Sequence, residues 1–190
     1  MGSSDALQLL QEGNRRFMAG KPIHPVDFSQ ARFELAENGQ RPFAAVLSCS
    51  DSRVPPEIVF DQGIGQLFVV RTAGNVADPI AIGSVEYAVQ HLHTSLVVVL
   101  GHQQCAAVAA AISGGEHGTN IGAILREIQP SVQKTLSEGE EDVAGRCEGE
   151  NVRHTVSKLR NSRILSQHIG EKKLMVVGAM YDLRTGEVSF

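Results

Sequence analysis

Short, continuous apolar runs rich in valine alternate with helical stretches over most of the chain. Four runs have the length of a strand, at residues 43–48, 67–71, 95–100 and 173–179. Runs of this kind are typical of parallel strands that are covered on both faces. Helical patterns separate them at residues 78–91, 103–112, 120–136 and 151–169. The alternation predicts an α/β fold, with a mostly parallel central β-sheet flanked by helices.

The two ends of the chain have patterns of their own. Residues 5–18 carry apolar side chains at helical spacing (Leu7, Leu10 and Phe17), and a second helix is predicted from Ser29 to just before Gly39. We interpret residues 1–38 as an N-terminal helical arm. The last residues, 180–190, predict a strand, a Thr185-Gly186 turn and a short strand at the edge of the sheet. A length of 190 residues suits a single domain, 1–190.

Composition and charge narrow the classes of function. The net charge is −4 and the 17 Lys and Arg residues are spread along the chain, so we expect no nucleic-acid partner. No apolar run approaches the roughly 20 residues that span a bilayer, so we expect no membrane partner either. The start lacks a secretory signal, which predicts a cytoplasmic location, although a chain whose leader has been removed would look the same. Three cysteines, an odd number, suit metal binding better than a disulfide framework.

Two motifs concentrate reactive side chains directly after predicted strands. Cys49-Ser-Asp-Ser-Arg53 follows the first strand, and His102-Gln-Gln-Cys105 follows the run that ends at Leu100. In parallel sheets the ligands bind beyond the carboxyl ends of the strands. We therefore expect groups about fifty positions apart to meet at one edge of the sheet.

Two thiolates and an imidazole favour zinc over the oxygen-loving cations magnesium and calcium. Cys49, His102 and Cys105 would leave one position of a tetrahedral zinc open to water, which the metal would acidify. Asp51 could close that position, or Arg53 could hold it away in a two-pronged contact. The alternatives are ordinary buried thiols beside a core histidine, and a closed structural zinc.

The chain resembles the β-class carbonic anhydrases, whose signature is Cys-x-Asp-x-Arg followed by His-x-x-Cys. The resemblance covers essentially the whole chain, and further matching segments lie at residues 48–54, 67–75, 84–89, 101–105 and 177–182. It implies reversible hydration of carbon dioxide to bicarbonate and a proton. Zinc-bound hydroxide would attack carbon dioxide, with Cys49, His102 and Cys105 as the zinc ligands and Asp51 and Arg53 as the orienting dyad.

The same resemblance implies a substrate pocket and an oligomer. Gln40, Phe68 and Tyr87 match residues that line the carbon dioxide pocket, partly from the neighbouring subunit, and we assign Ala73 and Ala106 to that pocket as well. An obligate homodimer, or a tetramer of two dimers, is implied, with N-terminal helices that embrace the partner. In this interpretation the apolar stripe Leu7, Leu10 and Phe17 belongs to the embracing arm. Without the resemblance, the same stripe would simply pack on its own sheet.

Two departures from the family pattern stand out. Ala106 follows Cys105 where the family usually has glycine, which predicts a tighter pocket or altered anion binding. Some members hold a regulatory bicarbonate with an aromatic residue where this chain has Val46. Arg71 matches the arginine of that site, but without the aromatic residue we expect no such regulation.

Cys147 matches no family motif and is interpreted as a free, exposed thiol.

Two rival functions remain open on the sequence alone. Some relatives of this scaffold hydrolyse carbonyl sulfide or carbon disulfide with the same metal chemistry. A zinc-binding, non-catalytic bicarbonate sensor, with Asp51 on the metal, is the alternative outside enzymes.

Overall fold

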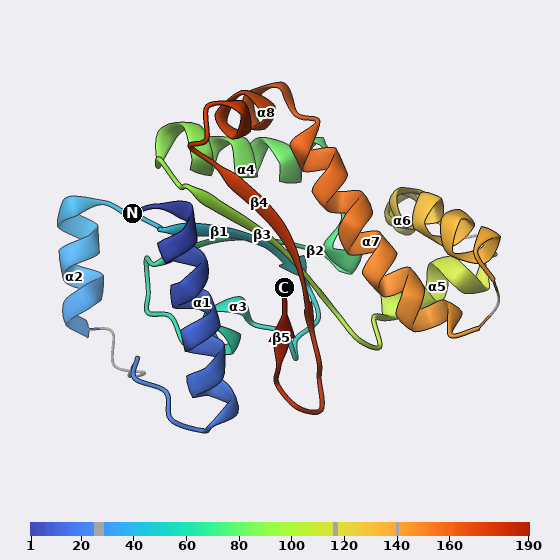
Figure 1. The fold of residues 1–190 in the computed structure, drawn as a ribbon, viewed down its shortest axis with the longest axis horizontal. Coiled ribbons are helices and arrows are strands. Elements are labelled where there is room, and N and C mark those ends of the chain that lie inside the picture. The colour runs from blue at the N-terminus through green and yellow to red at the C-terminus, as the bar shows by residue number, and fades with distance from the viewer. Residues whose placement is uncertain (25–28, 116–117, 140) are drawn as a thin grey trace.

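A five-stranded sheet runs through the centre of the molecule (Figure 1). The computed structural model describes residues 1–24, 29–115, 118–139 and 141–190. The strand order is β2-β1-β3-β4-β5, and every pair is parallel except the last. The strands are β1 (Ala44–Cys49), β2 (Leu67–Thr72), β3 (Leu96–His102), β4 (Met175–Tyr181) and β5 (Val188–Ser189). The predicted α/β fold with a mostly parallel sheet is confirmed.

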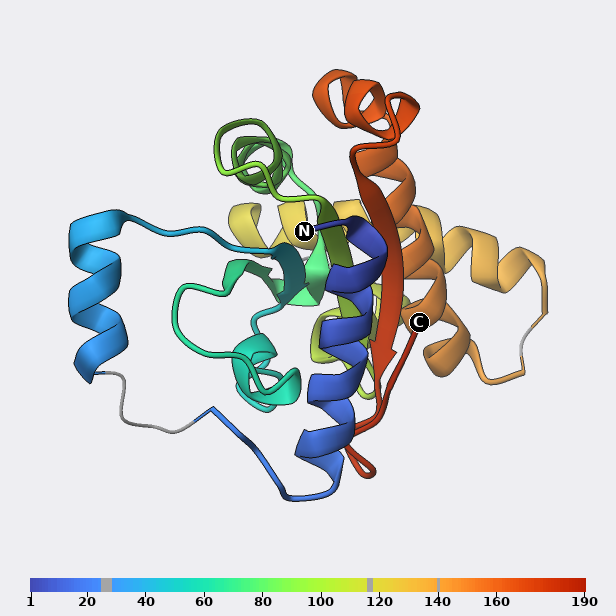
Figure 2. The ribbon, with the colours of Figure 1, turned by 60° about the vertical axis from the view of Figure 1, so that its left-hand side comes forward.

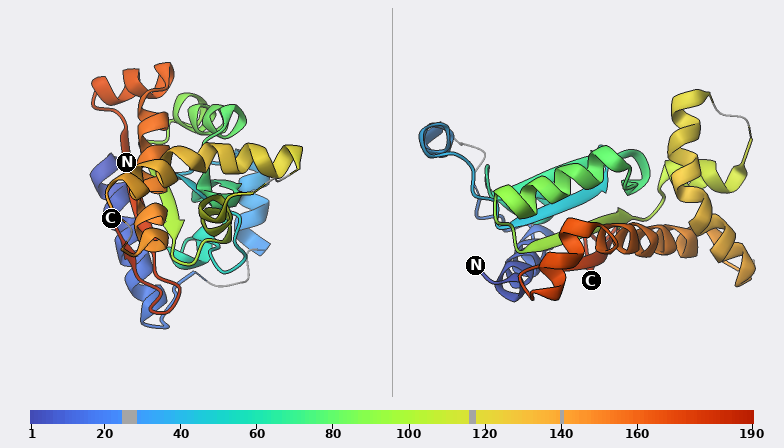
Figure 3. Two further views of the ribbon diagram at one scale, coloured as in Figure 1. Left: turned by 90° about the vertical axis from the view of Figure 1, so that its right-hand side faces the viewer. Right: turned by 90° about the horizontal axis from the view of Figure 1, so that it is seen from above.

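Helices cover both faces of this sheet, as the view from above shows (Figure 3). They are α1 (Ser3–Met18), α2 (Ser29–Asn38), α3 (Pro56–Val59), α4 (Pro79–His91), α5 (Ala106–Ser113), α6 (Thr119–Ser137), α7 (Val143–Arg160) and α8 (Arg163–Gly170). One apolar layer joins the sheet to α4, α7 and α8, and the opposite layer joins it to α1 and α3. The two central strands, β1 and β3, are buried along their whole length. Their valine-rich composition follows from being covered on both faces.

Element boundaries beside the two motifs differ from the sequence-based expectation. Cys49 and His102 are the last residues of β1 and β3 instead of following them. Helix α5 begins at Ala106, because residues 103–105 form a turn.

The predicted helix at 151–169 is two helices. Helix α7 begins at Val143, where the Asp142 carboxylate accepts a hydrogen bond from Gly145 N at 3.3 Å, and it ends at Arg160. Ser162 then caps α8 through Leu165 N, so the chain turns between the two helices.

Helix α1 lies on its own sheet. Leu10 is fully buried in the layer beneath this helix, and Leu7 and Phe17 pack against the same layer. Burial within the chain thus uses Leu10 fully and Leu7 and Phe17 in part, as expected of a stripe that packs on its own sheet, and the contact of this stripe with a partner stays a prediction. Helix α2 projects from one side of the fold (Figures 1 and 2), lies against it through Leu35 beside Gly65, and exposes Phe33. The role of residues 1–38 in dimerisation stays a prediction, and Phe33 is a further apolar candidate for that contact.

No helix among the described residues combines the length and the apolarity needed to cross a bilayer.

Candidate metal centre

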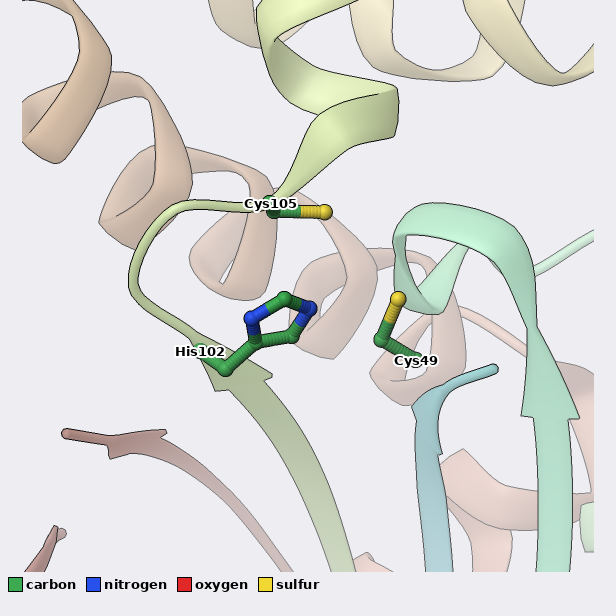
Figure 4. Close-up of side chains that lie close together, drawn as sticks. All are labelled: Cys49, His102 and Cys105. Atoms are coloured by element: carbon green, nitrogen blue, oxygen red, sulfur yellow. The ribbon is translucent and has the colours of Figure 1, made fainter. Parts of the chain in front are cut away.

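Three side chains point toward a common centre at the carboxyl edge of the sheet (Figure 4). The ligand atoms of Cys49, His102 and Cys105 all lie within 4.8 Å of one another. All three residues are at most 5% exposed. Two sulfurs and an imidazole nitrogen at this spacing form a donor set of the kind that holds zinc.

The topology explains why these residues meet. Strands β1 and β3 are parallel neighbours, so Cys49 and His102 end adjacent strands on the same side. The turn after β3 then returns the chain to Cys105, which caps the amino end of α5. The sequence-based prediction that the two motifs share one edge is confirmed.

The backbone of the next residue, Gln103, orients the imidazole ring of His102. Its Nδ1 lies 2.7 Å from the carbonyl oxygen of Gln103, and a carbonyl can only accept, so Nδ1 carries the proton. The lone pair is then on Nε2, which is fully buried and has no hydrogen-bond partner among the described residues. A buried, unpartnered nitrogen that faces two sulfurs fits a metal ligand, since a metal bond would satisfy it.

The contact between the two thiols shifts their pKa values in opposite directions. Hydrogen bonding with Cys105 lowers the pKa of Cys49, while the same contact, together with burial, raises the pKa of Cys105. The backbone N–H of Gly74 also donates to the Cys49 sulfur, at 3.3 Å, which stabilises a thiolate there. Burial alone would lower the pKa of His102, but the nearby Cys49 sulfur raises it. The cluster is therefore arranged around negative charge, as a cation site requires.

Asp51 and Arg53 form a two-pronged ion pair beside the cluster. Arg53 Nε donates to Asp51 Oδ1 at 2.9 Å, and Arg53 Nη2 donates to Asp51 Oδ2 at 2.7 Å. The guanidinium hydrogen bonds hold the pKa of Asp51 well below its usual range. Asp51 Oδ2 lies 3.9 Å from His102 Nε2, so the carboxylate faces the centre while both of its oxygens are engaged by arginine.

Arg71 braces the loop that carries the ion pair. Its guanidinium donates to the carbonyl oxygens of Cys49 at 3.0 Å, Asp51 at 2.6 Å and Val54 at 3.2 Å. Val46 lies fully buried in β1. The expected absence of a regulatory bicarbonate site stays a prediction.

Comparison with known proteins identifies the family. The carbonic anhydrase family model matches residues 44–188. Carbonic anhydrase 2 of Mycobacterium tuberculosis is 43% identical over 185 residues, which is 95% of this chain and 89% of that protein. The chain belongs to the carbonic anhydrase family.

Solved structures place it in the β class of that family. The β-carbonic anhydrase CafA of Aspergillus fumigatus superposes with a TM-score of 0.76 at 28% identity, over 98% of this chain and 88% of that one. The tetrameric β-carbonic anhydrases of Sordaria macrospora share the fold, with a TM-score of 0.76 at 24% identity over 97% of this chain and 96% of that one.

The pocket residues suggested by the carbonic anhydrase resemblance fall into two groups. Ala73 directly follows β2, in the turn whose Gly74 contacts Cys49, and Ala106 is the first residue of α5. Both lie at the carboxyl edge with the metal cluster.

The other three lie toward the amino edge. Gln40 lines a cavity of about 600 Å³ before β1, together with His91 and His93. Phe68 and Tyr87 form an aromatic pair with ring centroids 6.4 Å apart. Phe68 lies four residue steps before Thr72, the strand partner of Cys49, which corresponds to about 13 Å along a strand. Within one chain, Gln40, Phe68 and Tyr87 therefore do not lie at the metal cluster.

Three buried polar residues of α7 near the cluster escaped the sequence analysis. Glu148, Asn151 and Thr155 each bond to backbone atoms of the segments around the thiols. Their spacing of three and four residues places them on one stripe of a helix, beside apolar positions. That spacing is the signal that could have found them.

The interpretation of Cys147 as an exposed thiol is wrong. Cys147 is free but fully buried in the apolar cluster that contains Ile128 and Val132 of α6. The sequence analysis placed the start of the helix at residue 151, so Cys147 was not expected to lie in a helix that packs against α6. Burial raises the pKa of the Cys147 thiol, which makes it a poor nucleophile.

Proposed function

We propose that this carbonic anhydrase family member catalyses the reversible hydration of carbon dioxide to bicarbonate and a proton, with zinc as its cofactor. The observation that carries the proposal is the buried cluster of Cys49, His102 and Cys105 beside the Asp51–Arg53 ion pair. Family membership supports the reaction, and the donor set supports the metal.

Cys49, His102 and Cys105 would hold the zinc through two sulfurs and Nε2. Three protein ligands leave one tetrahedral position for a small molecule, the arrangement of catalytic zinc sites. Zinc held by these residues would supply Lewis acidity, which makes water available as a nucleophile near neutral pH. Gln103 keeps the imidazole in the tautomer that this ligand set needs.

Asp51 would orient the attacking water and Arg53 would orient Asp51. The pKa of Asp51 lies well below neutrality, so the carboxylate accepts a hydrogen bond without taking the proton. Arg53 engages both carboxylate oxygens and holds them away from the ligand position. This pairing weighs against the non-catalytic sensor, in which Asp51 would close the site.

A second copy of the chain would complete the substrate pocket. Ala73 and Ala106 would contribute from the chain that binds the metal. Gln40, Phe68 and Tyr87, which lie toward the opposite edge, would contribute from the partner. Tyr87 is 51% exposed and Ile80 of the same helix is 79% exposed, so α4 presents an apolar surface that a homodimer would cover. We therefore propose a homodimer, or a tetramer of two dimers, with the exposed apolar side chains of α4 and the tetrameric relatives as support.

Stopped-flow measurement of proton release from carbon dioxide tests the proposal. We expect one zinc per chain, fast turnover in the zinc-loaded protein, and loss of turnover when a chelator removes the metal. Re-addition of zinc should restore the rate. If the zinc-loaded protein hydrolyses carbonyl sulfide but does not hydrate carbon dioxide, carbonyl sulfide would replace carbon dioxide as the proposed substrate. If it turns over neither molecule, the result would favour the non-catalytic sensor.

A further inference from the structure

Helix α7 buries a stripe of three polar side chains in an otherwise apolar environment. Glu148, Asn151 and Thr155 follow one another at spacings of three and four residues, and none is more than 7% exposed. Apart from Glu150, their buried neighbours on the helix are apolar: Cys147, Val152, Val156 and Leu159. Burying polar groups destabilises a fold unless each finds a hydrogen-bond partner, so the partners reveal what the stripe does.

Glu148 bonds to the turn that carries one thiol. Its Oε1 accepts a hydrogen bond from Cys105 N at 2.9 Å. The turn also provides the Gln103 carbonyl that fixes the His102 tautomer, at 2.7 Å. On its outer side, the Gln104 carbonyl accepts from Arg53 Nη2 at 3.4 Å. The turn at residues 103–105 thus connects His102, Cys105 and Arg53, and Glu148 of α7 bonds to it.

Asn151 and Thr155 bond to the turn that contacts the other thiol. Asn151 Nδ2 donates to the carbonyl of Gly74 at 2.7 Å, and Thr155 Oγ1 donates to that of Asn75 at 3.2 Å. The N–H of the same Gly74 donates to the Cys49 sulfur. The helix therefore reaches both thiols, each through one backbone segment.

Both turns adopt backbone conformations that need support. Gln104 has φ of 55° and Asn75 has φ of 45°, in the left-handed region that residues other than glycine seldom occupy. Such conformations cost free energy and persist when their surroundings determine them. The hydrogen bonds from α7 stabilise the left-handed conformation in each turn.

We propose that the polar stripe of α7 presets the metal site, with Glu148 as the positioning residue for Cys105 and Asn151 as the positioning residue for Cys49 through Gly74. This inference rests on the proposed zinc centre, since it assigns these residues a role in metal affinity. Neither side chain touches the ligand atoms, so both act through the backbone.

Glu150 provides a matched control on the same helix. It has the same 7% exposure as Glu148, but its carboxylate binds Lys134 and Arg153, each at 2.7 Å. Removing Glu150 breaks two part-buried ion pairs and no hydrogen bond to either turn. Glu150 therefore reports on stability alone, whereas Glu148, two residues before it, reports on ligand positioning.

The test compares Glu148→Ala, Glu148→Gln, Asn151→Ala and Glu150→Ala in the full chain. Zinc affinity is measured by competition with a chelator, and the cobalt(II)-substituted proteins are compared by their thiolate-to-cobalt absorption. Loss of a group that orients a ligand costs about tenfold to a hundredfold in metal affinity, and we expect that loss for Glu148→Ala with an altered cobalt spectrum. Glu148→Gln should recover part of the affinity, because its amide oxygen can still accept from Cys105 N. Asn151→Ala should lose several-fold.

Glu150→Ala should unfold more easily than wild type and yet bind zinc within about twofold of it. Equal zinc affinity in folded Glu148→Ala and wild type, or an equal loss in Glu150→Ala, would overturn the inference. If Glu148→Ala does not fold, Glu148→Gln decides by the same affinity and spectrum. Because the readout is metal binding, a wild type without carbon dioxide turnover would overturn the proposed reaction while this pattern of affinities still stands.

Discussion

The two edges of the sheet differ in how complete they are within one chain. At the carboxyl edge, the three candidate ligands are at most 5% exposed, and backbone and side-chain hydrogen bonds hold the turns around them. Toward the amino edge, Tyr87 is half exposed and Gln40 lines an open cavity. Contacts within the chain complete the first region, whereas the second leaves half of the Tyr87 side chain exposed.

This difference separates two requirements of the proposed enzyme. Metal binding depends on a few atoms held at short distances, which neighbouring strands β1 and β3 provide within one chain. A pocket for an apolar gas depends on a wall, and the candidate wall residues lie at the wrong edge for their own metal. Changes at the carboxyl edge should therefore alter metal content or chemistry, while changes toward the amino edge should alter the use of substrate alone.

The largest effect should come from removing a ligand. Cys105→Ala should leave zinc near zero and lower carbon dioxide turnover by at least about a thousandfold, because a donor of the proposed metal is lost. Metal analysis beside the rate measurement checks this. Cys147→Ala is the control, since it is also a buried free thiol; it should keep its zinc and lose about 1 kcal/mol of unfolding free energy. Full zinc in Cys105→Ala would contradict the ligand assignment.

Arg53→Ala should come next. The zinc content should be unchanged, because Arg53 touches no ligand atom, while turnover should fall roughly a hundredfold to a thousandfold once Asp51 loses its two-pronged partner. Zinc analysis and stopped-flow kinetics on the same sample separate the two effects. An Arg53→Ala protein with wild-type turnover would remove the orienting role.

A smaller effect is expected toward the amino edge. Gln40→Ala should keep zinc and the cobalt spectrum of wild type, but kcat/KM for carbon dioxide should fall by about tenfold, since it would disturb the pocket of the neighbouring chain. Gln133→Ala, an exposed glutamine of α6, serves as the control and should change neither quantity. If Gln40→Ala altered metal affinity instead, the separation of the two edges would fail.

Ala106→Gly should have the smallest effect. It removes one methyl group beside Cys105 at the start of α5, so zinc content should stay the same while KM or inhibition by azide changes a few-fold. Identical kinetics and azide inhibition in the two proteins would show that this methyl group does not reach the pocket.

The sheet and the ligand set were predictable because each depends on local sequence. Valine-rich runs define β1 and β3, and two motifs at their ends bring Cys49, His102 and Cys105 to one edge. The signal is strong since the residue types and the strand ends agree.

The start of α7 was missed for a physical reason. Gly145 and Gly149 weaken the local preference for a helix, whereas packing against α6 and the Asp142 cap stabilise one. The buried role of Glu148 was hidden in the same way, because an acidic residue in a helix usually faces water. The stripe of α1 was ambiguous, since one apolar face suits either a partner or the chain's own sheet.

Mixing two impaired variants tests most directly whether one active site uses both edges. Arg53→Ala damages the carboxyl edge and Gln40→Ala the amino edge, so a mixed dimer would pair one undamaged carboxyl edge with one undamaged amino edge. After joint unfolding and refolding in equal amounts, turnover should rise above that of both parents toward about one quarter of the wild-type rate, as random C2 pairing requires. A mixture that stays at the average of its zinc-loaded parents would contradict the shared site.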